Sequence, residues 1–248
     1  GIHIFKADLV VIDKLSESES LLGNGKLQHS FPHSWRSKAP LVYRATSQWF
    51  ISMEKKNLRK KALKAIDDTT FYPKKGRDRI RSMIETRPDW CISRQRLWGV
   101  PLPLFVSKKT NEPLKDPEVI ENIAKIYEKE GADCWFTDDP QRFLGKKYKK
   151  EDYIKSNDIV EVWFDSGATH SYVLEKRKDL TWPASMYLEG SDQHRGWFHS
   201  SLLESCGTRG RAPFNSILTH GFVVDGKGLK MSKSTGNIIA PEDILKKY

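Results

Sequence analysis

The sequence predicts an α/β fold with parallel strands, and three segments carry this prediction. Ser185–Leu188 is an apolar, strand-like run that breaks at Glu189 and is followed by a helix-compatible segment over residues 191–206. Two further buried strands are expected, at Ile217–Val224 and within Asp158–Gly167. Because ligands of open α/β sheets bind at the carboxyl ends of the strands, the polar corner at Glu189 is a candidate site.

Composition narrows the class of partner. The 248 residues suffice for a substantial core, and the formal net charge of +10 favours a polyanion such as nucleic acid, a nucleotide or an acidic membrane surface. No run approaches the roughly 18 apolar residues that span a bilayer, and no signal segment is present. We therefore expect no membrane association and a cytoplasmic location.

The residues that could bind metal are poorly arranged for it. Cys91, Cys134 and Cys206 form no Cys-x-x-Cys pair, which fits a reducing compartment better than a disulfide framework. His29 and His33 are four residues apart, but Pro32 lies between them and no cysteine is adjacent. We expect no metal site.

The first half of the chain alternates helical and extended patterns. Ile2–Phe5 is expected to be extended, Asp8–Leu15 helical and Leu41–Thr46 a buried strand. Met53–Ile66 and Gly76–Glu85 have the apolar spacing of amphipathic helices. The lysine-rich face of the first is expected to be solvated, with contact to RNA phosphates as the alternative.

Arg94 and Arg96 are candidates for phosphate recognition. In extended backbone they would share a face, and guanidinium groups bind phosphate in a fork geometry. The alternative is a structural salt-bridge cluster. Val100–Val106 is expected to be a strand interrupted by prolines, and residues 107–157 a lysine-rich surface insertion with a helix at Pro117–Glu130.

Two dense motifs occupy the last quarter of the chain. Glu-Gly-Ser-Asp-Gln-His-Arg-Gly-Trp-Phe begins at Glu189, and its Ser191 or Asp192 is a candidate N-cap for the helix that follows. Lys-Met-Ser-Lys-Ser begins at Lys230, after the two-glycine loop Asp225–Gly228, and a helix is expected to open at Pro241. Taken singly, the motifs could be a capped turn and a solvated loop. No Gly-x-Gly-x-x-Gly motif is present, which disfavours a nicotinamide or flavin enzyme.

Together, and with Trp-Phe-Asp-Ser-Gly at residues 163–167 ahead of them, these motifs resemble the catalytic core of class I aminoacyl-tRNA synthetases, and specifically of the isoleucyl-tRNA synthetases. The resemblance covers nearly the whole chain. It implies the second half of a Rossmann-type parallel-sheet nucleotide-binding catalytic domain with an inserted connecting segment. Residues 1–40 would be the tail of the inserted editing domain and the return to the catalytic fold, 41–234 the catalytic half, and 235–248 the start of the helical stem-contact region.

The resemblance also implies the chemistry. A carboxylate of L-isoleucine attacks the α-phosphate of ATP, which binds with Mg2+, and the isoleucyl group then passes to tRNA(Ile). Positioning and charge stabilisation supply most of such catalysis. Lys233 is the first choice and Lys230 the second for stabilising charge on the phosphates.

The remaining roles implied by the resemblance are assigned as follows. Glu189, Gly190, Asp192 and Gln193 would bind isoleucyl-adenylate, with Trp163 and Trp197 as apolar walls, although single tryptophans are more often core residues. His220 and Gly221 would border the adenine of ATP, and Arg94 and Arg96 would lie near the acceptor end of the tRNA.

Parts of the family pattern are missing. The His-Ile-Gly-His signature, the active part of the editing insert and the anticodon-binding helices are absent, so we expect an internal piece of a longer ligase that does not form adenylate alone. Some family members have a Cys-x-x-Cys pair where this chain has Ser34 and Ser37, so we expect no zinc. The alternatives are a valyl-, leucyl- or methionyl-tRNA synthetase, or a basic RNA-binding fragment without an enzymatic role.

Overall fold

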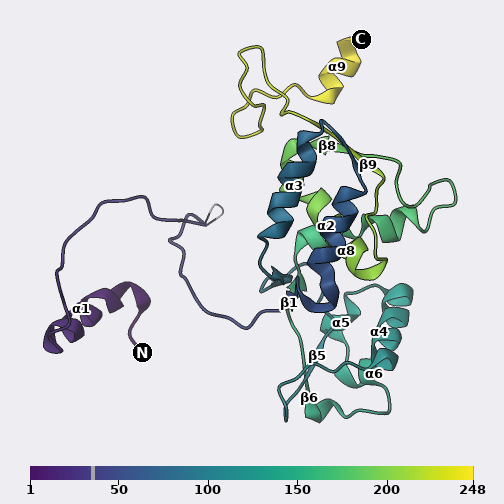
Figure 1. Cartoon of the computed structure of the whole chain (residues 1–248). Coiled ribbons are helices and arrows are strands. Elements are labelled where there is room, and N and C mark those ends of the chain that lie inside the picture. The colour runs from purple at the N-terminus through teal and green to yellow at the C-terminus, as the bar shows by residue number, and fades with distance from the viewer. Residues whose placement is uncertain (35–36, 248) are drawn as a thin grey trace. The chain divides into compact units, whose positions relative to one another are not determined.

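The computed structural model describes residues 1–34 and 37–247 and divides the chain into two units, Gly1–Ser47 and Gln48–Tyr248 (Figure 1). The helices are η1 (Ile4–Lys6), α1 (Ala7–Glu17), η2 (Lys55–Asn57), α2 (Leu58–Asp67), α3 (Lys75–Glu85), α4 (Pro117–Glu130), α5 (Cys134–Thr137), α6 (Pro140–Leu144), η3 (Lys150–Asp152), α7 (Val162–Gly167), η4 (His170–Leu174), η5 (Ser191–Arg195), α8 (Trp197–Thr208) and α9 (Pro241–Lys247). The strands are β1 (Phe50–Ile51), β2 (Thr70–Tyr72), β3 (Trp90–Cys91), β4 (Ser93–Arg94), β5 (Phe105–Ser107), β6 (Tyr153–Lys155), β7 (Ile159–Val160), β8 (Tyr187–Gly190) and β9 (Ser216–His220).

The first unit consists of α1 and irregular backbone. The helix expected at Asp8–Leu15 is confirmed, but the extended segment at Ile2–Phe5 is wrong because η1 begins at Ile4. The strand expected at Leu41–Thr46 is also wrong, and Tyr43 is 82% exposed. None of the described residues in this unit is buried. A β-branched, aromatic run forms a strand only where a partner and a core surface are available.

The second unit is built around a parallel sheet in the order β2-β9-β8. Ile217 of the central strand β9 pairs with Tyr187 of β8 on one side and with Phe71 of β2 on the other. Helix α8 connects β8 to β9, so these three elements form a βαβ unit. The predicted α/β fold with parallel strands is confirmed.

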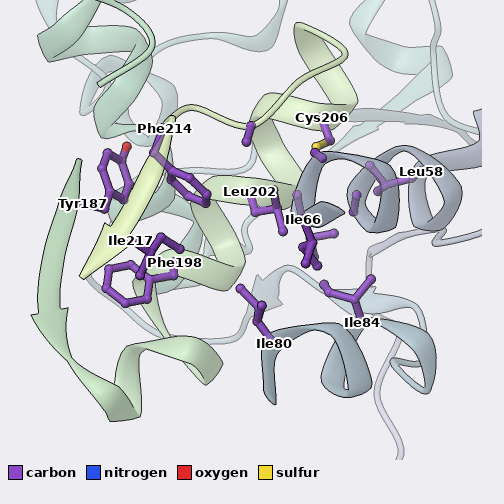
Figure 2. Close-up of a cluster of buried hydrophobic side chains, with 14 of the residues drawn as sticks. Leu58, Ile66, Ile80, Ile84, Tyr187, Phe198, Leu202, Cys206, Phe214 and Ile217 are labelled. Atoms are coloured by element: carbon purple, nitrogen blue, oxygen red, sulfur yellow. The ribbon is translucent and has the colours of Figure 1, made fainter. Parts of the chain in front are cut away.

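A hydrophobic core joins this sheet to α2, α3 and α8 (Figure 2). Phe198 and Leu202 of α8 and Ile217 of β9 are each fully buried. The helix expected at Gly76–Glu85 is confirmed as α3, whose Ile80 and Ile84 are buried. Complete burial of such side chains is worth roughly 1.5–3 kcal/mol each, which makes this cluster the main stabilising contact of the unit.

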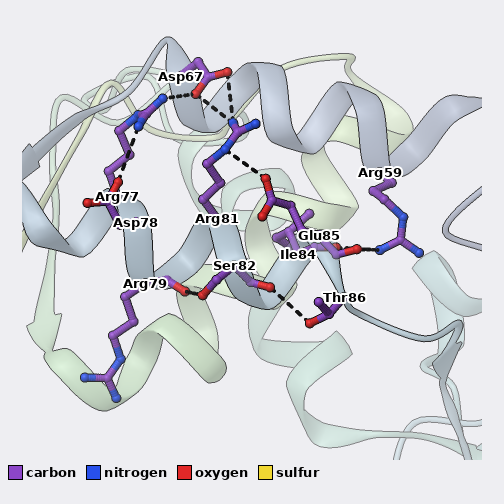
Figure 3. Close-up of polar contacts among 10 residues, drawn as sticks. All are labelled: Arg59, Asp67, Arg77, Asp78, Arg79, Arg81, Ser82, Ile84, Glu85 and Thr86. Atoms are coloured by element: carbon purple, nitrogen blue, oxygen red, sulfur yellow. Dashed lines mark hydrogen bonds and ion pairs between the residues drawn. The ribbon is translucent and has the colours of Figure 1, made fainter.

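Helices α2 and α3 are also linked by polar contacts (Figure 3). Asp67 at the end of α2 accepts hydrogen bonds from Arg77 and Arg81 of α3. Arg59 in the first turn of α2 donates to the backbone carbonyls of Ile84 and Glu85. The helix expected at Met53–Ile66 is present as α2 but begins only at Leu58. Lys56 and Asn57 before it have left-handed backbone angles, which interrupt a helix.

Residues 105–155 form a module with a core of their own. Strands β5 and β6 pair antiparallel, and Trp135 and Phe143 are fully buried beside them. The helix expected at Pro117–Glu130 is confirmed as α4, and the Asp116 side chain caps its start by accepting a hydrogen bond from the Glu118 amide. The assignment of residues 107–157 as an insertion remains a prediction.

Three expected strands are shorter than predicted. The strand expected at Val100–Val106 is limited to β5, which begins at Phe105. Within Asp158–Gly167 only β7 is a strand, and residues 162–167 form α7. Strand β9 ends at His220, so the expected continuation to Val224 is wrong. A buried apolar run suits a helix as well as a strand, and its periodicity does not separate the two. No helix within the described part of the chain combines the length and apolar character needed to cross a bilayer.

Candidate functional site

The carboxyl ends of β8 and β9 lie side by side and border a cleft. The parallel register sets Glu189 beside Thr219 and Gly190 beside His220. A cleft of about 280 Å3 opens at this edge of the sheet. It is lined by Glu189, Gly190, Asp192, Gln193, His220, Gly221, Phe222, Val223, Lys230 and Met231. The structure therefore brings together six residues expected at an adenylate or ATP site, together with one of the two candidate lysines. We call this the strand-end cleft.

The lysine motif reaches the cleft through a short hairpin after β9. Val224 and Lys230 form an antiparallel bridge, and the Met231 amide donates to the Val223 carbonyl at 3.0 Å. Asp225 closes the turn, because its Oδ1 accepts hydrogen bonds from the Lys227 amide at 2.9 Å and the Leu229 amide at 3.0 Å. The turn uses Gly228 at φ +76°, a conformation that glycine adopts without strain.

The two candidate lysines have different environments. Lys230 lines the strand-end cleft, where its Nζ lies 3.7 Å from the centroid of the Phe222 ring. This cation–π contact holds the ammonium group at the cleft. Lys233 is exposed, lies outside the cleft lining, and has no ion pair within the described residues. The structure thus places the second-choice lysine at the cleft, and the first-choice lysine on the outer turn of the loop.

Asn237 anchors the lysine loop, which the sequence did not predict. Its Nδ2 donates to Asp225 Oδ2 at 2.9 Å and to the Lys230 carbonyl at 3.2 Å. Its Oδ1 accepts from the Ser232 amide at 3.0 Å. The hydrogen bond from Asn237 is the main cause that lowers the pKa of Asp225, with smaller contributions from the Leu229 and Lys227 amides. One amide side chain thus connects both strands of the hairpin to the loop.

We predict that Asn237→Ala releases this loop without unfolding the sheet. The variant removes the acceptor of the Ser232 amide and the bond to the Asp225 carboxylate, so exchange of the Ser232 amide hydrogen should accelerate at least about tenfold. The pKa of Asp225 should rise toward its ordinary value. Hydrogen exchange and carboxylate NMR measure the two effects. Ile238→Ala, at an exposed neighbour, is the control, and equal acceleration in both variants would contradict the anchoring role.

The carboxylates at the cleft are held by local contacts. Glu189 Oε1 accepts a hydrogen bond from the Gly190 amide at 3.1 Å. A Cβ on Gly190 would lie 2.6 Å from Asp192 Oδ1, so a larger residue would displace that carboxylate. The close approach of backbone to side chain explains the glycine between two acidic residues.

Gln193 joins the cleft to helix α8. Its Nε2 donates to Asp192 Oδ2 at 3.2 Å, and its Oε1 accepts from the Trp197 amide at 3.0 Å. The expected N-cap at Ser191 or Asp192 is therefore wrong. The helical turn η5 intervenes, α8 begins at Trp197, and the side chain of Gln193 satisfies its first amide.

Neither tryptophan expected as a wall lines the strand-end cleft. Trp163 lies on α7 and packs against Gly196, where an added Cβ would be 2.9 Å from its Cη2. Trp197 stacks on Tyr187 with ring centroids 4.1 Å apart, and its Nε1 donates to the Ser166 carbonyl at 3.0 Å. Trp197 packs on the βαβ unit, whereas Trp163 remains 41% exposed beside Gly196.

The two candidate arginines also lie outside the cleft lining. Arg94 forms an ion pair with Glu161 at 3.3 Å, and the buried Glu161 carboxylate accepts a 2.7 Å hydrogen bond from Trp90 Nε1. Arg96 is exposed and follows the end of β4, so it does not share a strand face with Arg94. The contacts of Arg94 are those of a structural cluster, which was the alternative from the sequence.

The apolar side of the cleft comes from residues that the sequence did not indicate. Phe222 and Val223 follow the end of β9, and Met231 follows Lys230. The sequence feature that could have indicated them is Gly221, because a glycine within a strand pattern weakens the strand and often marks a bend. No group of three or more His, Cys, Asp or Glu side chains positioned to hold a metal ion occurs among residues 1–34 and 37–247.

A parallel βαβ unit with a polar cleft at its carboxyl edge and a basic loop beside that cleft defines an α/β domain of the Rossmann type. The model of the family described as tRNA synthetases class I (I, L, M and V) matches residues 8–248. The chain belongs to this family of class I tRNA synthetases.

Relatives within the family make the resemblance more specific. The chain is 78% identical over 248 residues to the isoleucine–tRNA ligase of Pelagibacter ubique, covering all of this chain and 27% of that protein. It is 56% identical over 246 residues to the isoleucine–tRNA ligase of Brucella abortus, covering 97% of this chain and 25% of that protein. The chain thus spans about a quarter of the length of these relatives.

A solved structure shows the same fold at low sequence identity. The methionyl-tRNA synthetase of Mycobacterium tuberculosis, bound by methionyl-adenylate, has a TM-score of 0.51 and 18% identity to this chain. The match covers 90% of this chain and 35% of that one. It supports the predicted Rossmann-type catalytic fold.

Proposed function

We propose that the whole protein carrying this chain is an isoleucine–tRNA ligase, which activates L-isoleucine with ATP and transfers it to tRNA(Ile). The observation that carries this proposal is the strand-end cleft, which gathers two carboxylates, His220 and Lys230 at the carboxyl edge of a parallel sheet. The 78% identity to an isoleucine–tRNA ligase supports isoleucine over valine, leucine or methionine as the amino acid.

The proposed roles follow from chemical complementarity. Glu189 and Asp192 present carboxylates to the α-ammonium group and ribose hydroxyls of isoleucyl-adenylate, and His220 and Gly221 border the adenine. Phe222 and Met231 add apolar contact within the same cleft. Lys230 and Lys233 stabilise negative charge on the phosphates as pyrophosphate leaves. Trp163 and Trp197 support the cleft indirectly, through Gly196 and Tyr187.

Mg2+ enters this proposal with the phosphates of ATP. Two acidic side chains line the cleft, and the described residues offer no larger group of metal ligands there. When bound, Mg2+ neutralises phosphate charge, and it typically keeps waters and substrate phosphates as ligands. The expected site of action is the cytoplasm, where the transfer of isoleucine to tRNA supports translation.

Binding of a non-hydrolysable isoleucyl-adenylate analogue to this chain tests the proposal. We expect Glu189→Gln to weaken binding about tenfold to a hundredfold, because it removes one charge-assisted hydrogen bond to the ammonium group. Isothermal titration calorimetry measures the affinity. Glu112→Gln, at an exposed glutamate without an ion pair within the described residues, is the control. The proposal fails if bare tRNA binds tightly while the analogue does not bind, which would indicate an RNA-binding segment.

A further inference from the structure

A second polar cavity lies apart from the strand-end cleft, between the end of α3 and the start of α8. It measures about 480 Å3 and is lined by residues that include Arg87, Arg195 and His199. No carboxylate occurs among its described lining residues. We call it the arginine–histidine cavity. A cavity lined by two guanidinium groups and an imidazole, without an acidic side chain, carries a positive potential.

His199 is a buried polar side chain that has no hydrogen-bond partner in the described part of the chain. It is 3% exposed, and neither Nδ1 nor Nε2 has a hydrogen-bond partner within the described residues. Buried polar groups are nearly always hydrogen-bonded, so each exception requires an explanation. An external ligand in the cavity would supply the missing acceptor for its N–H.

The surroundings of His199 are cationic. Burial is the main cause that lowers the pKa of His199 to about 3, and Arg87 and then Arg195 add electrostatic repulsion to the protonated ring. The His194 carbonyl acts in the opposite direction, although it does not reach either ring nitrogen at hydrogen-bonding geometry. His199 also lies in the first turn of α8, where the helix end contributes partial positive charge. A bound anion would offset the repulsion between these arginines and a protonated His199 ring.

Arg87 is positioned for the same ligand. Its Nε is buried and has no hydrogen-bond partner among the described residues, and its guanidinium lies 5.5 Å from the centroid of Trp90. Burial lowers the pKa of Arg87, and the carboxylate of Glu161 acts against this effect. That carboxylate is held by Trp90 and Arg94 and does not line the cavity. Arg195 is exposed and has no ion pair in the described part of the chain.

The two hydroxyl groups at the cavity already donate hydrogen bonds to backbone carbonyls, so they are not free to bind an anion. The Ser82 hydroxyl donates to the Arg79 carbonyl, and the Thr86 hydroxyl donates to the Ser82 carbonyl (Figure 3). The unpaired donors at the cavity therefore belong to Arg87, Arg195 and His199. Guanidinium groups match the oxygens of phosphate in geometry as well as in charge.

We propose that the arginine–histidine cavity is a phosphate-binding subsite, in which Arg87, Arg195 and His199 bind a phosphoryl group of a nucleotide or of RNA. The proposal is independent of the role proposed for the strand-end cleft, because binding of phosphate is measured without isoleucine or an adenylate.

The test follows the imidazole of His199 by NMR in the chain labelled at histidine, with His199→Met assigning its resonance. Inorganic phosphate, ATP and a short single-stranded RNA are titrated separately. We expect the His199 resonances to shift and the pKa of His199 to rise when a ligand binds. If ATP binds more tightly than the RNA, the cavity is a nucleotide site. If the RNA binds more tightly than ATP, the cavity is a site for the RNA backbone. Binding of inorganic phosphate alone would overturn both as ligands.

Arg195→Gln is the decisive variant, because Arg195 is exposed and its loss does not disturb the core. We expect it to weaken binding about tenfold or more. Arg79→Gln is the matched control, since Arg79 is an exposed arginine of α3 outside the cavity lining, and its guanidinium makes no contact drawn in Figure 3. Equal weakening in the two variants, or unchanged His199 resonances with all three ligands, would overturn the proposal.

Discussion

Lys233→Ala in the whole protein is expected to slow formation of isoleucyl-adenylate by about a hundredfold to a thousandfold and to leave isoleucine affinity nearly unchanged. Removal of one charge-stabilising contact costs roughly 3–4 kcal/mol in the transition state. Lys233 lies on the exposed turn that follows Lys230, while Asn237 holds the base of the loop. We propose that movement of this turn brings Lys233 to the phosphates as charge develops on the leaving group.

Single-turnover adenylate formation and equilibrium isoleucine binding separate the two effects, with folding checked by circular dichroism. Lys227→Ala is the control, because Lys227 is exposed on the same hairpin and lies outside the cleft lining. Lys230→Ala belongs in the comparison, since Lys230 already lines the cleft. A normal rate with Lys233→Ala and a slow rate with Lys230→Ala would contradict the assignment and exchange the two roles.

We expect the free energy of unfolding of this chain to fall as the pH becomes alkaline, and we expect Glu204→Gln to remove most of this fall. Glu204 lies on α8, its Oε1 is buried without a hydrogen-bond partner among the described residues, and an added Cβ on Gly167 would lie 2.2 Å from that oxygen. Burial is the main cause that raises the pKa of Glu204 to about 9, and the nearby Asp165 and Glu161 add repulsion. At neutral pH the Glu204 carboxyl is therefore protonated in the folded state and ionised in the unfolded state.

The sign of the effect follows from this difference. A carboxyl whose pKa is raised on folding stabilises the fold fully below its unfolded pKa, and this stabilisation is lost as pH rises toward about 9. The slope is about 1.4 kcal/mol per pH unit, so the free energy of unfolding should fall by about 2 kcal/mol between pH 7 and 8.5. Glu204→Gln should flatten this slope.

Denaturant unfolding between pH 7 and 8.5 measures the slope. Glu128→Gln, at an exposed glutamate of α4, is the control and should keep it. Burial lowers the pKa of His170, His194 and His199, so these groups destabilise the fold only as pH falls below about 6.5, outside the measured window. An unchanged slope in Glu204→Gln would show that the carboxyl is ionised in the folded state.

Local patterns predicted much of the helical structure. Helix α4 matches its expected residues because an N-cap, a proline in the first turn and apolar spacing all agree. Helix α3 matches for a similar reason, since Ile80 and Ile84 are one turn apart and both reach the core. The sequence did not predict the start of α2, because Lys56 seldom adopts left-handed angles and gives no signal for them, although Asn57 is a residue type that adopts them more often.

The order of the motifs alone determined the family, and with it the parallel fold and the candidate residues Glu189, Gly190 and Lys230. The tertiary structure decided which of the candidates meet. It set His220 beside Gly190 through strand register, and it assigned Trp197 to packing and Arg94 to an ion pair. It also revealed Asn237 as the anchor of the lysine loop, and His199 as a group in a cationic cavity that has no hydrogen-bond partner among the described residues. Motifs are local in sequence, whereas hydrogen bonds, burial and electrostatic repulsion depend on residues that only folding brings within a few ångströms.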